Sequence, residues 1–167
     1  MLVCLIIAIY YSLQKLNLNN FNTEYVSNLK YMFQNCSSLT ELNINFNTEM
    51  NYDFSGMFAD CHLLTSINLN GFETKNAMSM TKMFQNCEKI TSLDLTKFNT
   101  TLVTDMSYMF ENNIKIEKLD LTSFNTDKCE NFEKIFEGCK NLTIKVVQGK
   151  NKGLIDAKPE YVTVEYA

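Results

Sequence analysis

A repeat of 25 to 26 residues runs through most of the 167-residue chain and constrains its fold more than any other feature. A Met-Phe dipeptide recurs in steps of 25, 26 and 26 residues, and a fourth step of 26 reaches Ile-Phe: Met32-Phe33, Met57-Phe58, Met83-Phe84, Met109-Phe110 and Ile135-Phe136. A Leu-x-Leu-like pair, a Phe, a Thr and a Cys keep the same period. Such a unit is too small to bury its apolar side chains alone, so the repeats are expected to stack into one continuous core.

Each repeat combines two hydrophobic periodicities. Leu93-Asp94-Leu95 alternates apolar and polar residues, which predicts a short half-buried strand. Val103, Met106, Met109 and Phe110 follow the spacing of one helix face, whose start Thr104 or Asp105 would cap. The equivalent faces are Val26, Leu29, Met32, Phe33 and Cys36 in the first full repeat, and Cys129, Phe132, Ile135, Phe136 and Cys139 in the last. We therefore predict an α/β repeat, a solenoid with short parallel strands on one face and short helices on the other.

The ends of the repeat array divide the chain into three parts. Residues 16–142 form five tandem repeats. Residues 1–15 are interpreted as a partial repeat or N-terminal cap, because a shift of 26 places Val3 on Leu29. A degenerate signal or anchor is the alternative, and a start inside a repeat allows the chain to be a fragment of a longer exported protein. Residues 143–167 are predicted to be a C-terminal β cap, with β-rich stretches at 143–148 and 161–166 around a polar loop that holds Pro159.

Composition narrows the classes of function. Apolar residues make up 46% and charged residues 20%, as in ordinary globular proteins, and the net charge of −4 disfavours nucleic acid as a partner. Five Gly and one Pro argue against β-sandwiches and barrels, which need many special turns. A single His and the lack of phosphate, dinucleotide or metal-helix motifs predict a chain that is not an enzyme and has no cofactor. The apolar run from Leu2 to Tyr11 is too short for a transmembrane span.

The six cysteines follow the repeat. Cys36, Cys61, Cys87 and Cys139 share one repeat position, and Asn113 fills the gap in the series. We interpret them as a column of buried thiols. A disulfide between neighbouring repeats is the alternative. A zinc site is disfavoured because no Cys-x-x-Cys pair exists, and catalysis by Cys61 with the adjacent His62 is disfavoured because the His position varies between repeats.

The consensus resembles a known repeat family. Residues 93–118, LDLTKFNTTLVTDMSYMFENNIKIEK, show it best. They resemble the BspA-type leucine-rich repeat, in the variant also called the mycoplasma lipoprotein-associated repeat, and the resemblance covers about residues 13–142. It implies a leucine-rich-repeat-like solenoid. It departs from ordinary leucine-rich repeats because Phe98 occupies the place of their Asn ladder, so the loop hydrogen bonds must be rebuilt, and we expect the Thr100 series to do this.

A binding surface is expected on the strand face, where residues flanking the Leu-x-Leu core point outward. These residues, with Lys15 leading, are Asn17, Asn19, Glu41, Asn43, Asn45, Ser66, Asn68, Asn70, Ser92, Asp94, Thr96, Lys118, Asp120 and Thr122. The row is polar, nearly neutral and without the Trp, Tyr and Arg anchors of tight interfaces. It is either a solvated sheet face or a weak, multivalent recognition face for protein or glycan. Tyr31, Tyr52 and Tyr108 are expected to offer a second patch on the helical side.

The function expected from the resemblance is a non-catalytic binding module, a cell-surface or secreted protein that mediates adhesion or protein–protein recognition. Its partner would be a protein, such as a host or matrix protein, or a glycan. The alternative is an intracellular scaffold for protein–protein contacts in the cytoplasm, because reducing compartments favour free thiols.

Overall fold

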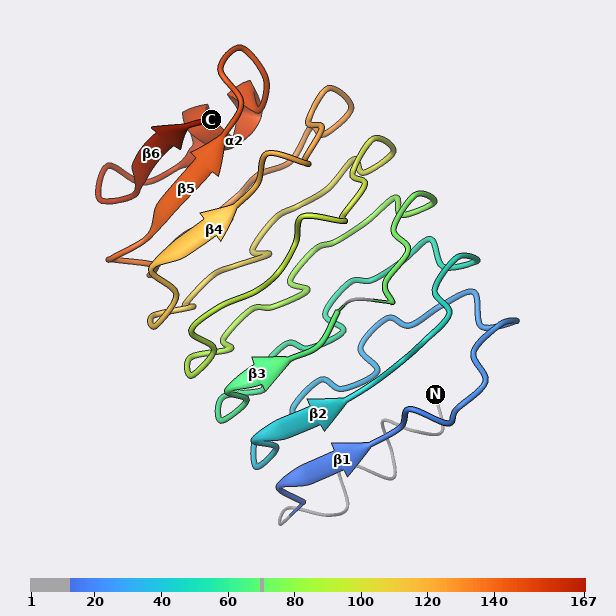
Figure 1. Ribbon diagram of the computed structural model, residues 1–167. Helices are drawn as coiled ribbons and strands as arrows, with labels where there is room; N and C mark the ends of the chain where they lie inside the picture. Colours follow the sequence, from blue (N-terminus) through green and yellow to red (C-terminus); the bar gives the residue numbers. More distant parts are fainter. Residues whose placement is uncertain (1–12, 70) are drawn as a thin grey trace.

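The computed structural model describes residues 13–69 and 71–167. Its chain winds into a stack of similar coils, where one coil is one repeat of 25 to 26 residues. Figure 1 shows the coils side by side from the N-terminal end to the C-terminal end, with the strands along one side of the stack.

Among the described residues, six short strands form two parallel sheets. In the first, β1 (Lys15–Asn17) pairs with β2 (Glu41–Asn43), which pairs with β3 (Ser66–Ile67). In the second, β4 (Lys118–Asp120) pairs with β5 (Thr143–Val146), which pairs with β6 (Thr163–Tyr166). The register places the inward Leu or Ile of each coil opposite that of the next: Leu16 opposite Leu42, Leu42 opposite Ile67, and Leu119 opposite Ile144. The segment around Leu93, predicted to be a strand, forms none, so the two sheets are separate.

The predicted fold class, an α/β leucine-rich-repeat-like solenoid with short helices on one face, is wrong. Within residues 13–69 and 71–167 the one helix is α2 (Lys152–Ala157), which lies in the C-terminal segment and not in a repeat. The segments predicted to be helices, with apolar faces at Val26–Cys36, Val103–Phe110 and Cys129–Cys139, are successions of turns and isolated bridges. The structure therefore consists of small parallel sheets and ordered loops, not of alternating strands and helices.

Tandem turns explain why the helical spacing misled the prediction. In one coil the N–H of Met32 donates to the carbonyl of Leu29, and the N–H of Cys36 donates to that of Phe33. The third residues of these turns, Tyr31 and Asn35, have φ of 57° and 62°, the left-handed conformation that a helix excludes. The later coils repeat the feature at Gly56 and Asp60, Lys82 and Asn86, Tyr108 and Asn112, and Lys134 and Gly138. Two turns in succession bury residues three and four apart, which is also the spacing of a helix face.

Backbone hydrogen bonds between coils replace those of a helix. Tyr31, Phe33 and Asn35 donate their N–H groups to the carbonyls of Ser55, Met57 and Ala59 in the next coil, each over 2.9 Å. The following coils repeat the pattern, so alternate amides bond to the neighbouring coil, as in a parallel sheet. A bridge ladder runs beside them through Asn28, Asp53, Ser79, Asp105 and Asn131. Asp105, expected to cap a helix, accepts the N–H of Ser107 and closes a turn instead.

A stack of phenylalanine rings fills the centre of the core. Phe33, Phe58, Phe84, Phe110 and Phe136 are fully buried. Consecutive ring centroids lie 5.7, 5.5, 5.9 and 5.8 Å apart, with interplanar angles of 3°, 12°, 6° and 7°. The Met-Phe repeat of the sequence therefore marks the core, as predicted.

A ladder of buried threonines rebuilds the loop hydrogen bonds, which confirms that expectation. The Thr74 hydroxyl donates to the carbonyl of Asn99 over 3.0 Å and accepts the N–H of the same residue over 2.7 Å. Thr48 and Thr100 make the same pair of bonds with the coil that follows each of them. Each hydroxyl thus satisfies one donor and one acceptor of a neighbouring loop.

At the C-terminal end the predicted strands at 143–148 and 161–166 are present as β5 and β6, and they extend the second sheet. The loop predicted between them contains α2. The boundaries proposed for the five repeats and for the C-terminal cap stay predictions. Most of the proposed N-terminal cap, residues 1–15, lies outside the described residues, which begin at residue 13.

Candidate binding surface

The residues predicted to form the binding face lie along the strand side of the stack, and none of those described is buried. Lys15, Asn17, Asn19, Asn45, Ser66, Asn68, Ser92, Asp94, Thr96 and Lys118 are exposed, and Glu41, Asn43, Asp120 and Thr122 are half-buried. Asn70 lies outside the described residues. Because the strands alternate inward and outward side chains, the buried leucines hold this row in register from coil to coil.

At the N-terminal end of the face, polar side chains pair with one another. Lys15 Nζ lies 2.9 Å from Glu41 Oε2, and Asn43 Nδ2 donates to Glu41 Oε1 over 3.1 Å. The hydrogen bonds from Lys15 and then Asn43 lower the pKa of Glu41, and the bond to Glu41 raises the pKa of Lys15. The charges in this region therefore compensate each other across two neighbouring strands.

Further along, each aspartate is held by the threonine two residues later. Asp94 Oδ1 accepts the Thr96 hydroxyl over 2.6 Å and the Thr96 N–H over 3.1 Å. Asp120 Oδ1 accepts the corresponding groups of Thr122 over 2.6 and 3.0 Å, and Lys145 Nζ lies 3.7 Å from its other oxygen. The hydrogen bonds from the two threonines lower the pKa of both aspartates. The strand face thus presents fixed, ionised carboxylates among amides and hydroxyls, an arrangement suited to hydrogen-bonded recognition.

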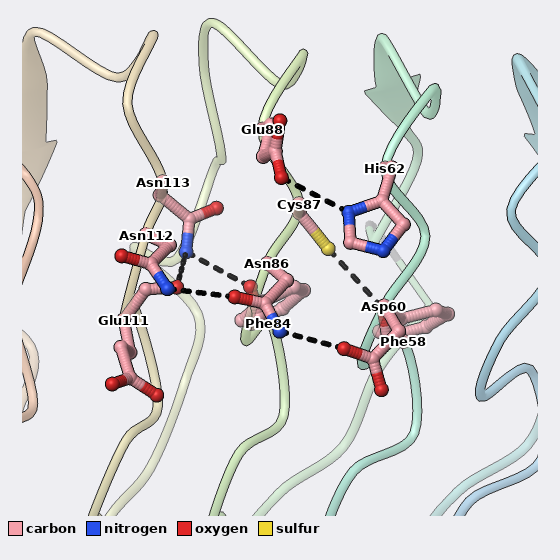
Figure 2. A network of polar contacts seen from close by, with 10 residues as sticks. All are labelled: Phe58, Asp60, His62, Phe84, Asn86, Cys87, Glu88, Glu111, Asn112 and Asn113. Carbon is pink, nitrogen blue, oxygen red and sulfur yellow. Dashed lines mark hydrogen bonds and ion pairs between the residues drawn. The ribbon is translucent and has the colours of Figure 1, made fainter.

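The predicted column of buried thiols lies in the core. Cys36, Cys61, Cys87 and Cys139 are buried and free, and Cys129 is half-buried and free. Cys87 Sγ donates to the carbonyl of Phe58 over 3.2 Å, and Asn113, which fills the gap in the series, donates its Nδ2 to the carbonyl of Phe84 over 2.8 Å (Figure 2). Both side chains therefore satisfy a carbonyl of the preceding coil. Burial raises the pKa of Cys87 to about 12, which keeps its thiol protonated.

A second polar ladder borders the column. Asn86 Nδ2 donates to Asp60 Oδ1 over 2.6 Å, and Asn112 Nδ2 donates to Asn86 Oδ1 over 2.8 Å (Figure 2). His62 Nδ1 lies 3.1 Å from Glu88 Oε1, whereas Cys61 Sγ donates to a backbone carbonyl. The adjacent thiol and imidazole therefore engage different partners.

The three tyrosines predicted to form a second patch do not gather in one place. Tyr31 and Tyr108 share the left-handed repeat position but belong to coils that are not adjacent. Lys30 Nζ lies 5.2 Å from the centre of the Tyr31 ring, and Lys82 Nζ lies 5.2 Å from that of Tyr108. Tyr52 occupies a different repeat position, where it is 47% exposed.

Sequence reasoning missed a group of exposed apolar side chains that includes Tyr25, Met50 and Met78. They lie two or four residues after the Thr that recurs in each repeat. At these two positions other repeats carry polar residues such as Asn76 and Glu130. A position-by-position comparison of the repeats could have found them, because the size and the polarity of the side chain vary at these two positions.

The described residues offer neither a metal site nor a membrane-spanning helix. No group of three or more His, Cys, Asp or Glu side chains in residues 13–69 and 71–167 is placed to hold a metal ion. No helix in this part of the chain is long and apolar enough to cross a membrane.

Comparison with known proteins identifies one family. The model of the family described as "Mycoplasma protein of unknown function, DUF285" matches twice, over residues 7–93 and 65–158. No curated protein and no solved structure matches the chain. The two overlapping matches together span residues 7–158 and so cover the whole repeat array, residues 16–142.

Proposed function

This chain belongs to the family of Mycoplasma proteins described as DUF285, and on that premise we propose that it is a non-catalytic binding module. Its repeats are of the BspA type of leucine-rich repeat, and it acts at the cell surface or as a secreted protein in adhesion or protein–protein recognition. The partner is a protein, such as a host or matrix protein, or a glycan.

One observation carries this proposal. At every described position the strand face carries an exposed or half-buried polar side chain, over a core that repeats from coil to coil. Asp94 and Asp120 occupy the same position in two successive coils, and each carboxylate is paired with the threonine two residues later. Repetition of one polar motif at the spacing of the coils suits multivalent recognition of an extended partner, because several weak contacts then act together.

The binding role is tested by replacing Asn43, Asn68 and Asp94 together with alanine. Immobilised host matrix proteins and glycans are the probes, and binding is measured by biolayer interferometry. A matched control carries alanine at three exposed positions off the strand face: Ser37, Lys89 and Thr101. We expect the strand-face variant to lose about tenfold or more in affinity, the control to keep it, and both to unfold within about 0.5 kcal/mol of the parent. Equal binding by both variants would exclude the strand face as the site.

A second candidate is an intracellular scaffold for protein–protein contacts. It is favoured by the free state of Cys36, Cys61, Cys87, Cys129 and Cys139, since reducing compartments keep thiols unpaired. Protease treatment of intact source cells, followed by an immunoblot for this chain, distinguishes the two. Loss of the protein while a cytoplasmic marker survives supports the surface assignment. Protection until the cells are lysed supports the intracellular scaffold.

A further inference from the structure

Five exposed apolar side chains form a patch that the core does not use, and we name it the apolar ridge. Tyr25, Met50, Tyr52, Met78 and Leu102 are 87%, 60%, 47%, 54% and 37% exposed. They come from four successive coils and occupy two repeat positions. The first position holds Tyr25, Met50 and Leu102, and the second, two residues later, holds Tyr52 and Met78.

Backbone hydrogen bonds hold the second position of the ridge in register. The N–H of Tyr52 donates to the carbonyl of Ser27 over 3.4 Å, and the N–H of Met78 donates to that of Tyr52 over 2.8 Å. The N–H of Thr104 donates to the carbonyl of Met78 over 2.9 Å. Chains bonded in this way lie about 4.8 Å apart, so equivalent side chains on neighbouring coils are neighbours in space. Tyr52 and Met78 are therefore neighbours on a fixed backbone, with Met50 two residues before Tyr52 and with Tyr25 and Leu102 in the flanking coils.

The repeat itself does not require apolar residues at these positions. Asn76 stands at the first position and Thr104 at the second, and the last repeat carries Lys128 and Glu130 at the two positions. The ordered backbone continues through all of these coils, since Glu130 donates its N–H to the carbonyl of Thr104 over 3.0 Å. Exposed Tyr and Met in a cluster are characteristic of protein interfaces, because both bury large surfaces and Met adapts to its partner.

Carboxylates outnumber cations around the ridge. The four stretches that carry it, residues 22–30, 47–55, 73–81 and 99–107, contain five acidic residues and two lysines. Both lysines are engaged: Lys75 Nζ lies 2.5 Å from Glu49 Oε1, and Lys30 Nζ lies 3.5 Å from Asp53 Oδ2. Lys75 also attracts Glu73, which contributes to the raised pKa of Lys75, so the two lysines are shared among several carboxylates and the four stretches keep an excess of negative charge. A partner that covers the ridge is therefore favoured when it carries positive charge, and an anionic membrane surface is repelled.

From this combination we propose that the apolar ridge binds a basic, amphipathic peptide segment of a partner protein. Apolar side chains of the segment pack on Met50, Tyr52 and Met78, while its lysine or arginine side chains pair with Glu24 and Glu73. The proposal rests on the function proposed above, that of a binding module, and assigns it a second surface with its own partner chemistry.

The test uses the full chain and three fluorescein-labelled 12-residue peptides, measured by fluorescence anisotropy. One peptide alternates Leu and Lys, one alternates Ser and Lys, and one alternates Leu and Glu. We expect the Leu/Lys peptide to bind at least about tenfold more tightly than either of the others, and its affinity to fall as NaCl is raised from about 50 mM to about 500 mM.

Variants of the protein assign the binding to the ridge. The double variant Met50→Ser, Met78→Ser is expected to lose about tenfold in affinity for the Leu/Lys peptide, because these side chains supply the apolar contact. The double variant Glu24→Gln, Glu73→Gln is expected to weaken binding mainly at low salt. The strand-face variant with alanine at Asn43, Asn68 and Asp94 is the control and should bind within about twofold of the parent. Thermal unfolding verifies that each variant is folded.

Three results would overturn the proposal. Equal binding of the Ser/Lys and Leu/Lys peptides would show attraction by charge alone, and unchanged binding by the Met50→Ser, Met78→Ser variant would place the contact elsewhere. Self-association that the peptide displaces and the same variant abolishes, seen in sedimentation velocity, would make a second copy of the chain the occupant. The peptide results do not depend on whether the strand-face variant changes binding to matrix proteins or glycans. The two proposals can therefore fail independently of each other.

Discussion

Replacing Phe84 with alanine tests whether the ring stack holds the coils together. The Phe84 ring is fully buried, and its centroid lies 5.5 Å from that of Phe58 and 5.9 Å from that of Phe110. A buried Phe→Ala change costs about 3–5 kcal/mol, to which each lost ring pair contributes about 0.5–1.5 kcal/mol. Because each coil contacts only its neighbours, the loss falls in the middle of the stack and weakens the coupling of its two halves.

Urea unfolding followed by far-UV circular dichroism and tyrosine fluorescence measures this effect. The chain has eight tyrosines and no tryptophan, so tyrosine is the intrinsic probe. We expect the unfolding midpoint of Phe84→Ala to fall and its transition to broaden or split into two phases. Phe21→Ala is the matched control: Phe21 is 56% exposed, so its loss should cost less than about 1 kcal/mol. A cost below about 1 kcal/mol for Phe84→Ala, or equal costs at both positions, would refute the central role of the stack.

Three further predictions concern single positions. Gly56→Ala should destabilise the fold, because a Cβ there would clash with the Tyr31 ring and because the left-handed φ of 60° strains a residue with a side chain. A Tyr31→Ala background should remove the steric part of that cost and leave the backbone part, as measured in a double-mutant cycle of urea midpoints. Asn113→Cys should keep or raise the stability, since a thiol makes the same hydrogen bond at this position in other coils and the unpaired amide oxygen of Asn113 is removed. Asn113→Ala should lower the free energy of unfolding by about 1–3 kcal/mol in the same assay. Burial raises the pKa of Cys87 from 9.0 to about 12, so the stability that the buried thiol contributes is complete below pH 9. The urea midpoint should therefore fall as the pH rises from 9 towards 12, and it should fall less in Cys87→Ala. An equal fall in both proteins would contradict the assignment.

The repeat predicts the core of this fold because core positions have one role in every coil. The Met-Phe series, the thiol column and the threonine ladder all follow from residues that recur at one period, and each forms the contacts expected of it. Asn113 shows the strength of this reasoning, since it interrupts the cysteines and yet makes their hydrogen bond.

Secondary structure could not be predicted in the same way. Buried residues at spacings of three and four are shared by a helix face and by two tandem turns, and periodicity alone does not separate them. The difference lies in Tyr31 and Asn35, whose left-handed φ stops a helix from forming. Asn and Gly at such positions are turn signals, but Tyr31, Lys82, Tyr108 and Lys134 are not, and tertiary hydrogen bonds overcome their preference.

The candidate surfaces, too, could be predicted from the sequence only in part. The alternation of apolar and polar residues predicts that Asp94 and Asp120 lie on the outer side of the core, and Asp94 is exposed and Asp120 half-buried. It does not predict that each carboxylate is held by a threonine two residues later. Of the apolar ridge, Tyr52 alone was predicted to lie in a surface patch, and there it was grouped with other residues, because the ridge residues do not recur at every repeat. Methods that look for shared positions exclude the residues in which repeats differ.

The hydrogen bonding of the coils explains why such differences accumulate on the ridge. At its second position the backbone donates to the neighbouring coil whichever side chain is present, as the bonds of Tyr52, Met78, Thr104 and Glu130 demonstrate. The side chain itself contributes little to folding there, so its chemistry is free to change from coil to coil at small cost in stability. Residues such as Phe84 have no such freedom. A repeat protein of this kind can therefore keep its core constant while it changes its partners at exposed positions, and the partner-specific residues of related chains should be sought there.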